Sequence, residues 1–216
     1  AGATDLGAST VSGTLGITSA GAVTDSGTLA ITGATTISAS GQDITLDQAA
    51  STFGTLALTG ANVAVSDAGA VDLGASTVGG TLGITSGGAV TDSGTLAITG
   101  ATTISASGQD ITLDQAASTF GTLALTGVNV AVTDAGAVDL GASTVSGTLG
   151  ITSAGAVTDS GTLAVTGATT ISASGQDITL DQAASTFGSL LLTGANVAVT
   201  DAGAVDLGTS TVSGTL

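Results

Sequence analysis

Apolar residues alternate with small or polar residues along short stretches of this chain. The segments 14–18, 28–32, 43–47 and 62–65 each place their Leu, Ile or Val residues two positions apart. Alternation with a period of two predicts half-buried β-strands. No stretch sustains the helical period, and Glu, Lys, Arg and Met, which favour helices, are absent. The pattern therefore predicts an all-β protein.

A second, longer period organises these strands. The sequence that begins at Asp5 begins again at Asp72, at Asp139 and at Asp206. A fixed period of about 67 residues indicates a solenoid or an array of small domains. We expect residues 1–216 to form one continuous solenoid segment, cut from a longer repetitive chain. The expected repeats are 5–71, 72–138, 139–205 and a partial fourth, 206–216.

The spacing of the strands favours a parallel β-helix. Strand centres recur every seven or eight residues, separated by Gly, Ser, Asp or Asn. If about three strands make one coil, a coil averages about 22 residues and each repeat holds three coils. The apolar residues would then stack on three faces. These faces are Leu15/Ile17 with Ile37 and Leu56/Leu58, Val23 with Ile44/Leu46 and Val63/Val65, and Leu29/Ile31 with Phe53 and Val71/Leu73.

An array of β-sandwich domains is the competing architecture. Sandwich cores usually contain several aromatic residues. Each repeat offers only one, at Phe53, Phe120 and Phe187. A domain as small as one repeat would have a thin core, so the solenoid is the better interpretation.

The residue types that are missing exclude whole classes of function. The chain has no Lys, Arg, His or Cys, and its 16 acidic residues, all Asp, give a net charge of −16. Without cationic side chains, nucleic-acid binding and attraction to anionic membranes are not expected. The usual general bases, thiol nucleophiles and zinc ligands are also missing. We therefore do not expect catalysis. No apolar run is long enough to cross a bilayer, so we do not expect membrane insertion either.

Two segments suggest a family. Residues 27–41 (GTLAITGATTISASG) and 54–65 (GTLALTGANVAV) resemble repeats of the filamentous haemagglutinin type. Those repeats belong to large adhesins that bacteria secrete through two-partner systems. The resemblance implies a right-handed parallel β-helix that forms an elongated stalk outside the cell.

Aspartates are the only ionisable side chains, and one set of them recurs at coil-like intervals. If each Asp follows the second strand of its coil, these carboxylates form a column along one edge, and like charges about 5 Å apart repel by about 1 kcal/mol in water. Calcium would relieve this repulsion. The alternative, which we favour, is that each Asp caps its own turn through a hydrogen bond. No cofactor is predicted beyond this candidate calcium site. The calcium candidates are Asp25, Asp47, Asp67, Asp92, Asp114, Asp134, Asp159, Asp181 and Asp201.

Two other arrangements have simple structural explanations. Asp43 and Asp47 are spaced like paired catalytic carboxylates, but the pair recurs in every repeat, and an active site is rarely copied in this way. The threonine pairs Thr14/Thr18, Thr28/Thr32 and Thr55/Thr59 could suggest ice binding. Their spacing does not require a shared face, and threonine is a common strand residue.

The sequence therefore predicts a non-catalytic structural protein. We expect a stalk- or fibre-forming segment of a large extracellular protein on a bacterial surface. Its expected partners are its own neighbouring repeats and other copies of the same protein in a filament or bundle. The alternative is a solenoid that binds calcium, ice or a glycan along one face.

Overall fold

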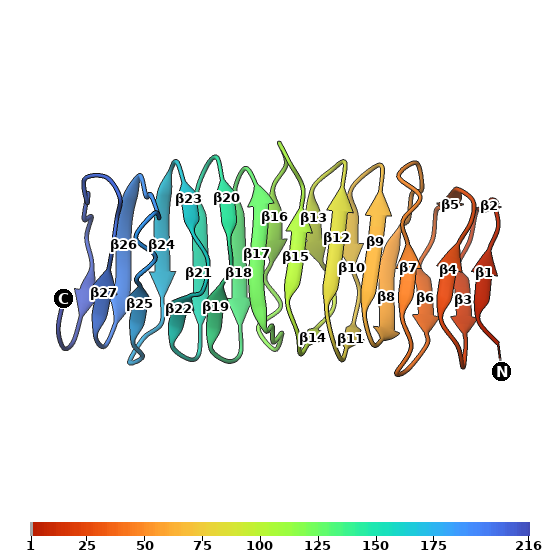
Figure 1. Ribbon diagram of the computed structural model, residues 1–216, viewed down its shortest axis with the longest axis horizontal. Helices are drawn as coiled ribbons and strands as arrows, with labels where there is room; N and C mark the ends of the chain where they lie inside the picture. Colours follow the sequence, from red (N-terminus) through yellow and green to blue (C-terminus); the bar gives the residue numbers. More distant parts are fainter. Residues whose placement is uncertain (1) are drawn as a thin grey trace.

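The protein forms one elongated, all-β solenoid, which a computed structural model describes over residues 2–216. In Figure 1 the coils follow one another along the long axis, with the two ends of the chain at opposite ends of the rod. Every strand pair is parallel. The predicted all-β parallel solenoid is confirmed. Within the described residues, no helix is long and apolar enough to cross a membrane.

Most strands belong to two long sheets, here called face 1 and face 2, and short margin strands lie beside them. Face 1 contains β1 (Thr4–Leu6), β4 (Val23–Asp25), β7 (Ile44–Leu46), β9 (Val63–Asp67), β12 (Leu82–Ser86), β15 (Thr102–Ser105), β17 (Thr122–Gly127), β19 (Val138–Leu140), β22 (Val157–Asp159), β25 (Ile178–Leu180) and β27 (Val197–Val199). Face 2 contains β3 (Leu15–Thr18), β6 (Thr35–Ser38), β8 (Thr55–Gly60), β10 (Val71–Leu73), β13 (Val90–Asp92), β16 (Ile111–Leu113), β18 (Val130–Asp134), β21 (Leu149–Ser153), β24 (Ala168–Ser172), β26 (Ser189–Gly194) and β28 (Thr211–Val212). The margin strands are β2 (Ser9–Val11), β5 (Leu29–Ile31), β11 (Ser76–Val78), β14 (Leu96–Ile98), β20 (Ser143–Val145) and β23 (Leu163–Val165).

The coil is shorter than the sequence suggested, and this changes how repeats fit together. Residues paired on successive coils are 17 to 22 positions apart, as in Leu123 with Leu140 and Ala30 with Thr52. Face 1 takes seven steps from β1 to β19, two strands that occupy the same position two repeats apart. Two repeats therefore complete seven coils, and one repeat completes three and a half. The expectation of three longer coils in each repeat is corrected accordingly.

The half coil means that successive repeats present the same sequence on opposite sides. Strand β10 opens the second repeat on face 2, whereas the equivalent strands β1 and β19 lie on face 1. The margin strands alternate likewise, with β5 and β20 along one edge in Figure 1 and β11 and β14 along the other. The rod is thus two-sided, with each surface feature repeated on both faces.

Two of the three predicted faces are confirmed, and the third is partly wrong. Ile17, Ile37 and Leu58 pair in one column of face 2, and Val23, Ile44 and Val63 pair in face 1. The third group divides. β5 reaches the segment of Phe53 through the bridge between Ala30 and Thr52, but Val71 and Leu73 belong to β10, which pairs with β8 and β13.

The reason is the short turn after β9. The chain passes from β9 to β10 without a margin strand, so this coil closes early and the next strand falls on the opposite face. Residues 75–79 contain the margin strand β11 of the next coil.

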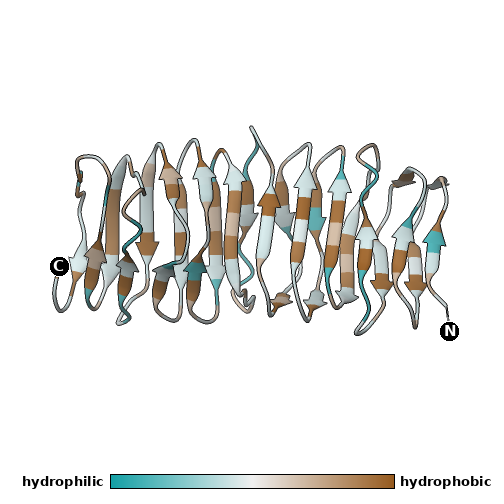
Figure 2. Ribbon diagram, viewed as in Figure 1, coloured by the Kyte–Doolittle hydropathy of each residue, from teal (hydrophilic) through white to brown (hydrophobic). Residues whose placement is uncertain are grey.

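One continuous apolar core fills the space between the faces. It runs from Val23 to Val197 as a single cluster, with a Phe in each repeat. Figure 2 shows the apolar bands alternating with pale ones along the strands. Burial of alternate side chains, as in the pattern of β9 (Val63 and Val65 in, Ala64 out), explains the period of two in the sequence.

Glycine is required where coils or turns leave no room for a side chain. Gly41, Gly108 and Gly175 have positive φ (71°, 79° and 75°), and each lies in a tight turn before an Asp. Gly94 has ordinary φ, but a Cβ there would overlap the backbone of Ala75 on the preceding coil. These positions explain part of the glycine content.

Candidate functional site

The predicted aspartates lie at the ends of successive strands of one face within each repeat, but the series does not continue along that face into the next repeat. Asp25 ends β4, Asp47 follows β7 and Asp67 ends β9, on three successive coils of face 1. We call such a triplet a corner stack. The equivalent stack, Asp92, Asp114 and Asp134, lies on face 2, and the third, Asp159, Asp181 and Asp201, returns to face 1. The expectation of a single column is wrong because each repeat contains a half coil.

Asp67 caps its turn as predicted. Its Oδ1 accepts the backbone N–H of Gly69 at 2.7 Å, and its Oδ2 accepts that of Phe53 at 2.9 Å. The equivalent Asp134 accepts the N–H groups of Gly136 and Phe120. The carboxylate therefore closes its own turn and also fixes the preceding coil at the phenylalanine.

Asp25 makes a different set of contacts. Its Oδ1 accepts the backbone N–H of Asp47, on the next coil, at 3.0 Å. Its Oδ2 is buried and has no hydrogen-bond partner, and the same is true of Asp92 and Asp159. Each of these three residues is only 7% exposed. The turn-capping interpretation is wrong for these three, which join neighbouring coils instead.

Burial is the largest influence on the pKa of five of the corner-stack aspartates. It raises the pKa of Asp25 above its ordinary value of 3.8, while the N–H groups of Asp47 and Gln48 act in the opposite direction and the Asp47 carboxylate adds to the rise. The pKa values of Asp92 and Asp159 are raised by the same causes. Burial also raises the pKa of Asp67 and Asp134, against the backbone N–H groups that each accepts.

Asp47 and its equivalents are exposed and lie at the outer side of the stack. The Gln48 amide donates to the Asp47 carboxylate and to the backbone carbonyl of Asp25, both at 3.4 Å. Among residues 2–216, no group of three or more His, Cys, Asp or Glu side chains is close enough to hold a metal ion. Calcium binding by the nine aspartates stays a prediction.

A second polar arrangement, not expected from the sequence, crosses the junction between repeats. Asp110 Oδ1 accepts the N–H of Asn129 at 3.0 Å and its side-chain amide at 3.0 Å. Asn129 Oδ1 in turn accepts the N–H and the hydroxyl of Thr148, both at 3.1 Å. We call this three-coil chain of hydrogen bonds the junction ladder. It recurs as Asp43, Asn62 and Thr81 and as Asp177, Asn196 and Thr215.

The sequence signal for the ladder was a polar residue immediately before three successive strands. Asp110, Asn129 and Thr148 precede β16, β18 and β21. They are 19 residues apart, which is one coil. The longer coil expected from the strand spacing does not align them.

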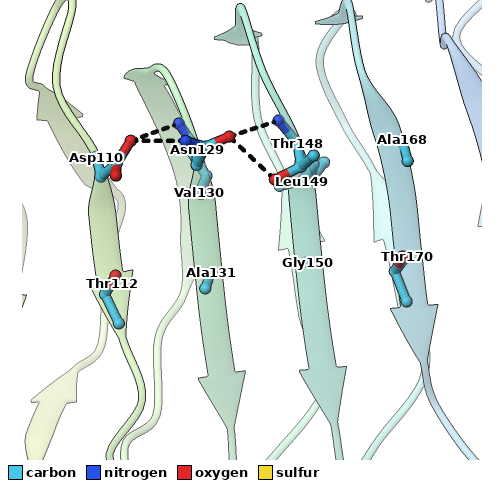
Figure 3. A pocket seen from close by; sticks show the side chains of 10 residues that line it. All are labelled: Asp110, Thr112, Asn129, Val130, Ala131, Thr148, Leu149, Gly150, Ala168 and Thr170. Carbon is cyan, nitrogen blue, oxygen red and sulfur yellow. Dashed lines mark hydrogen bonds between the residues drawn. The ribbon is translucent and has the colours of Figure 1, made fainter.

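The ladder borders a shallow hollow on face 2, shown in Figure 3. Its volume is about 350 Å³. The outward side chains of Thr112, Ala131 and Thr170 surround Gly150, whose missing side chain deepens the surface. The equivalent residues of the previous repeat lie on face 1, because of the half coil.

The structure separates the two carboxylates that are spaced like a catalytic pair. Asp43 precedes β7 and joins the ladder, whereas Asp47 follows β7 and joins the corner stack. The threonines do share rows in places: Thr18, Ser38, Thr59 and Thr77 are paired across four coils. The next coil places Ala97 in this row, so no unbroken threonine row forms there.

Fold and repeat together define the class: this is a tandem-repeat β-solenoid protein. More particularly, the chain belongs to the family described as "Repeats of unknown function (DUF5649)", whose model matches residues 1–59, 60–126 and 127–193. No curated protein and no solved structure matches the chain significantly.

Proposed function

We propose that the chain is a stiff, non-catalytic segment of a stalk or fibre on a large extracellular protein of a bacterial surface. The observation that carries this proposal is the unbroken core, which passes through the repeat junctions at 71/72 and 138/139 as one cluster. Solenoids of this kind behave as rods, since each coil contacts its neighbours and no flexible linker separates them. The junction ladder adds hydrogen bonds where two repeats meet.

The composition supports an exposed location. The net charge of −16 opposes side-to-side aggregation, and the absence of Lys and Arg removes the cleavage sites of trypsin-like proteases. The resemblance to haemagglutinin-type repeats supports the finer assignment to a secreted adhesin. Its partners would be further repeats of the same chain and other copies in a filament.

The test is a length measurement on chains with two, four and eight repeats. A rod gains about 17 Å per repeat, from three and a half coils at about 4.8 Å each. Small-angle scattering and electron microscopy should therefore show a maximum dimension that rises in proportion to the repeat number. A dimension that grows as the square root of the repeat number would describe beads on flexible linkers and would contradict the proposal.

The hollow beside the junction ladder favours a second candidate, binding of a glycan. Its volume of about 350 Å³ lies within the range of small-ligand sites, and hydroxyl, amide and carboxylate groups line it. Binding can be measured on a glycan array with the Gly150→Gln variant as control, because the added side chain would occupy the hollow. Equal binding by the wild type and the Gly150→Gln variant would exclude the hollow as the glycan site.

A further inference from the structure

Asp25, Asp92 and Asp159 hold a buried carboxylate oxygen that nothing in the protein satisfies. Their Oδ2 atoms have essentially no contact with solvent and no hydrogen-bond donor. Burial of an ionised oxygen without partners is strongly unfavourable, because the lost hydration is not replaced. Because the same defect recurs at one position in each of three repeats, it is a feature of the repeat.

The charged surroundings of these residues contain only further carboxylates. For Asp92, the strand on one side places Leu73 in register, next to Asp72, and the coil on the other side contributes Asp114. The chain has no Lys, Arg or His anywhere. No side chain can therefore neutralise this carboxylate, and its partner must come from solution.

The space around Oδ2 decides which partner fits. A calcium ion requires six to eight oxygen ligands at about 2.3–2.6 Å, and this oxygen is enclosed, while Oδ1 is occupied by the N–H of Asp114 at 2.8 Å. A proton needs no additional volume, and it removes the buried charge and the repulsion from Asp114 together. We propose that Asp25, Asp92 and Asp159 are proton-binding sites, one per repeat, through which mild acidification strengthens the solenoid.

The direction of the effect follows from linkage. The pKa of each of these carboxyls is raised in the folded chain, chiefly by burial. Between the ordinary value of 3.8 and the raised value, the folded state binds more protons than the unfolded state, so stability falls as pH rises. The stability gained by protonation is complete below pH 3.8 and is lost as the pH rises through the pKa of the carboxyl in the folded chain. A pKa that is higher by one in the folded state than in the unfolded state changes the folding equilibrium constant about tenfold.

The experiment compares the full chain with the triple variant Asp25→Asn, Asp92→Asn, Asp159→Asn. Urea unfolding is followed from pH 7.5 to pH 4.5 in the presence of EDTA. We expect the wild-type midpoint to rise on acidification. The variant, which carries neutral amides at the three sites, should be more stable than wild type at pH 7.5 and should show a shallower pH dependence.

The matched control is Asp43→Asn, Asp110→Asn, Asp177→Asn, which removes the same charge from exposed sites and keeps the side-chain oxygen that accepts the asparagine amide. It should keep most of the pH dependence of the wild type. A triple variant at Asp25, Asp92 and Asp159 that keeps the wild-type pH slope would overturn the proposal, as would a wild-type midpoint that falls on acidification.

A direct measurement covers the case in which the triple variant does not fold. Carboxyl ¹³C shifts of the wild-type chain should show that Asp25, Asp92 and Asp159 titrate above the ordinary value of an aspartate, as should Asp67 and Asp134. Calcium is tested separately: addition of CaCl₂ at pH 7.5 should leave these carboxyl shifts unchanged. Calcium-dependent shifts at the three sites would show a cation site and contradict proton binding as their role.

Discussion

The two ends of the same strands show how differently a solenoid can use aspartate. Where β7 and β9 begin, Asp43 and Asn62 belong to an exposed junction ladder in which the bonded oxygens each accept two donors. Where the strands of this face end, Asp25 and Asp67 lie buried in the corner stack. Asp67 has both oxygens satisfied, whereas Asp25 has one without a partner. Position along the strand therefore decides what the carboxylate does.

The difference has a physical cause in the cross-section. At the ladder end, the chain turns between the faces in the open, and water can reach the free carboxylate oxygen. At the corner end, the backbone of a neighbouring coil meets the carboxylates: the N–H of Asp47 bonds Asp25, and the N–H of Phe53 bonds Asp67. The ladder thus stabilises the repeat junctions through hydrogen bonds between exposed groups. The buried carboxylates of the corner stack make the stability of the fold depend on pH.

The largest effect is expected from a change that breaks the corner backbone. Gly94 lies just after the corner residue Asp92, and a Cβ there would overlap backbone atoms of Ala75. We expect Gly94→Ala to lower the free energy of unfolding by about 3 kcal/mol, the upper part of the range for overpacked sites. Urea unfolding measures it.

The matched control for this change is Gly83→Ala on the open face. Its nearest neighbour would be the carbonyl oxygen of Val63 at 3.8 Å, an ordinary contact. It should therefore alter stability by less than about 1 kcal/mol. Similar losses of stability at both positions would mean that the close approach of the coils does not require glycine at position 94.

The next effect concerns the ladder. Asn129→Ala removes the amide that joins Asp110 to Thr148 and should cost about 1–2 kcal/mol, since hydrogen bonds are lost but their partners can bind water. Asn129→Asp keeps the acceptor for Thr148 and places a carboxylate against Asp110. It should be destabilising at neutral pH and recover near pH 4, as unfolding curves at the two pH values would show. A loss independent of pH would mean that charge repulsion is not its cause.

The fold was largely predictable from the sequence because strand alternation and the long repeat period both report directly on the core. The pairing of Ile17, Ile37 and Leu58 followed from them. The half coil did not, because the turn after β9 omits a margin strand and nothing in the local composition of residues 68–70 marks that omission.

The site was less predictable for a related reason. Hydrogen bonds such as Asn129 to Thr148 depend on which residues are one coil apart, and a small error in coil length hides them. The aspartates of the corner stack could be identified from the sequence because the spacing between them is close to the coil length that the strand pattern predicted. Its burial was not foreseen, since the chain that covers Asp25 comes from the next coil.

A smaller, stabilising effect is expected where an unsatisfied group lies in the core rather than at the corner. Thr102 is fully buried, and its hydroxyl has no hydrogen-bond partner. Thr102→Val has nearly the same shape and removes the unsatisfied hydroxyl, so it should raise the free energy of unfolding by about 1 kcal/mol. The outward neighbour Thr103→Val is the control and should change stability little. A destabilised Thr102→Val protein would reveal a hydrogen bond that this hydroxyl makes in solution.

The smallest effect is the response of stability to salt, which should differ between the exposed and the buried aspartates. A chain with a net charge of −16 and no cationic side chain repels itself, and the screening length falls from about 30 Å at 0.01 M salt to about 3 Å at 1 M. We expect NaCl to raise the thermal midpoint by a few degrees, mainly through exposed carboxylates such as Asp110 and Asp114, because buried groups are screened less. The triple variant at Asp25, Asp92 and Asp159 should therefore keep most of its salt response while its pH response shrinks. If the triple variant lost its salt response together with its pH response, the carboxylates of the corner and of the ladder would be equally screened by salt. The contrast between the two strand ends would then not hold.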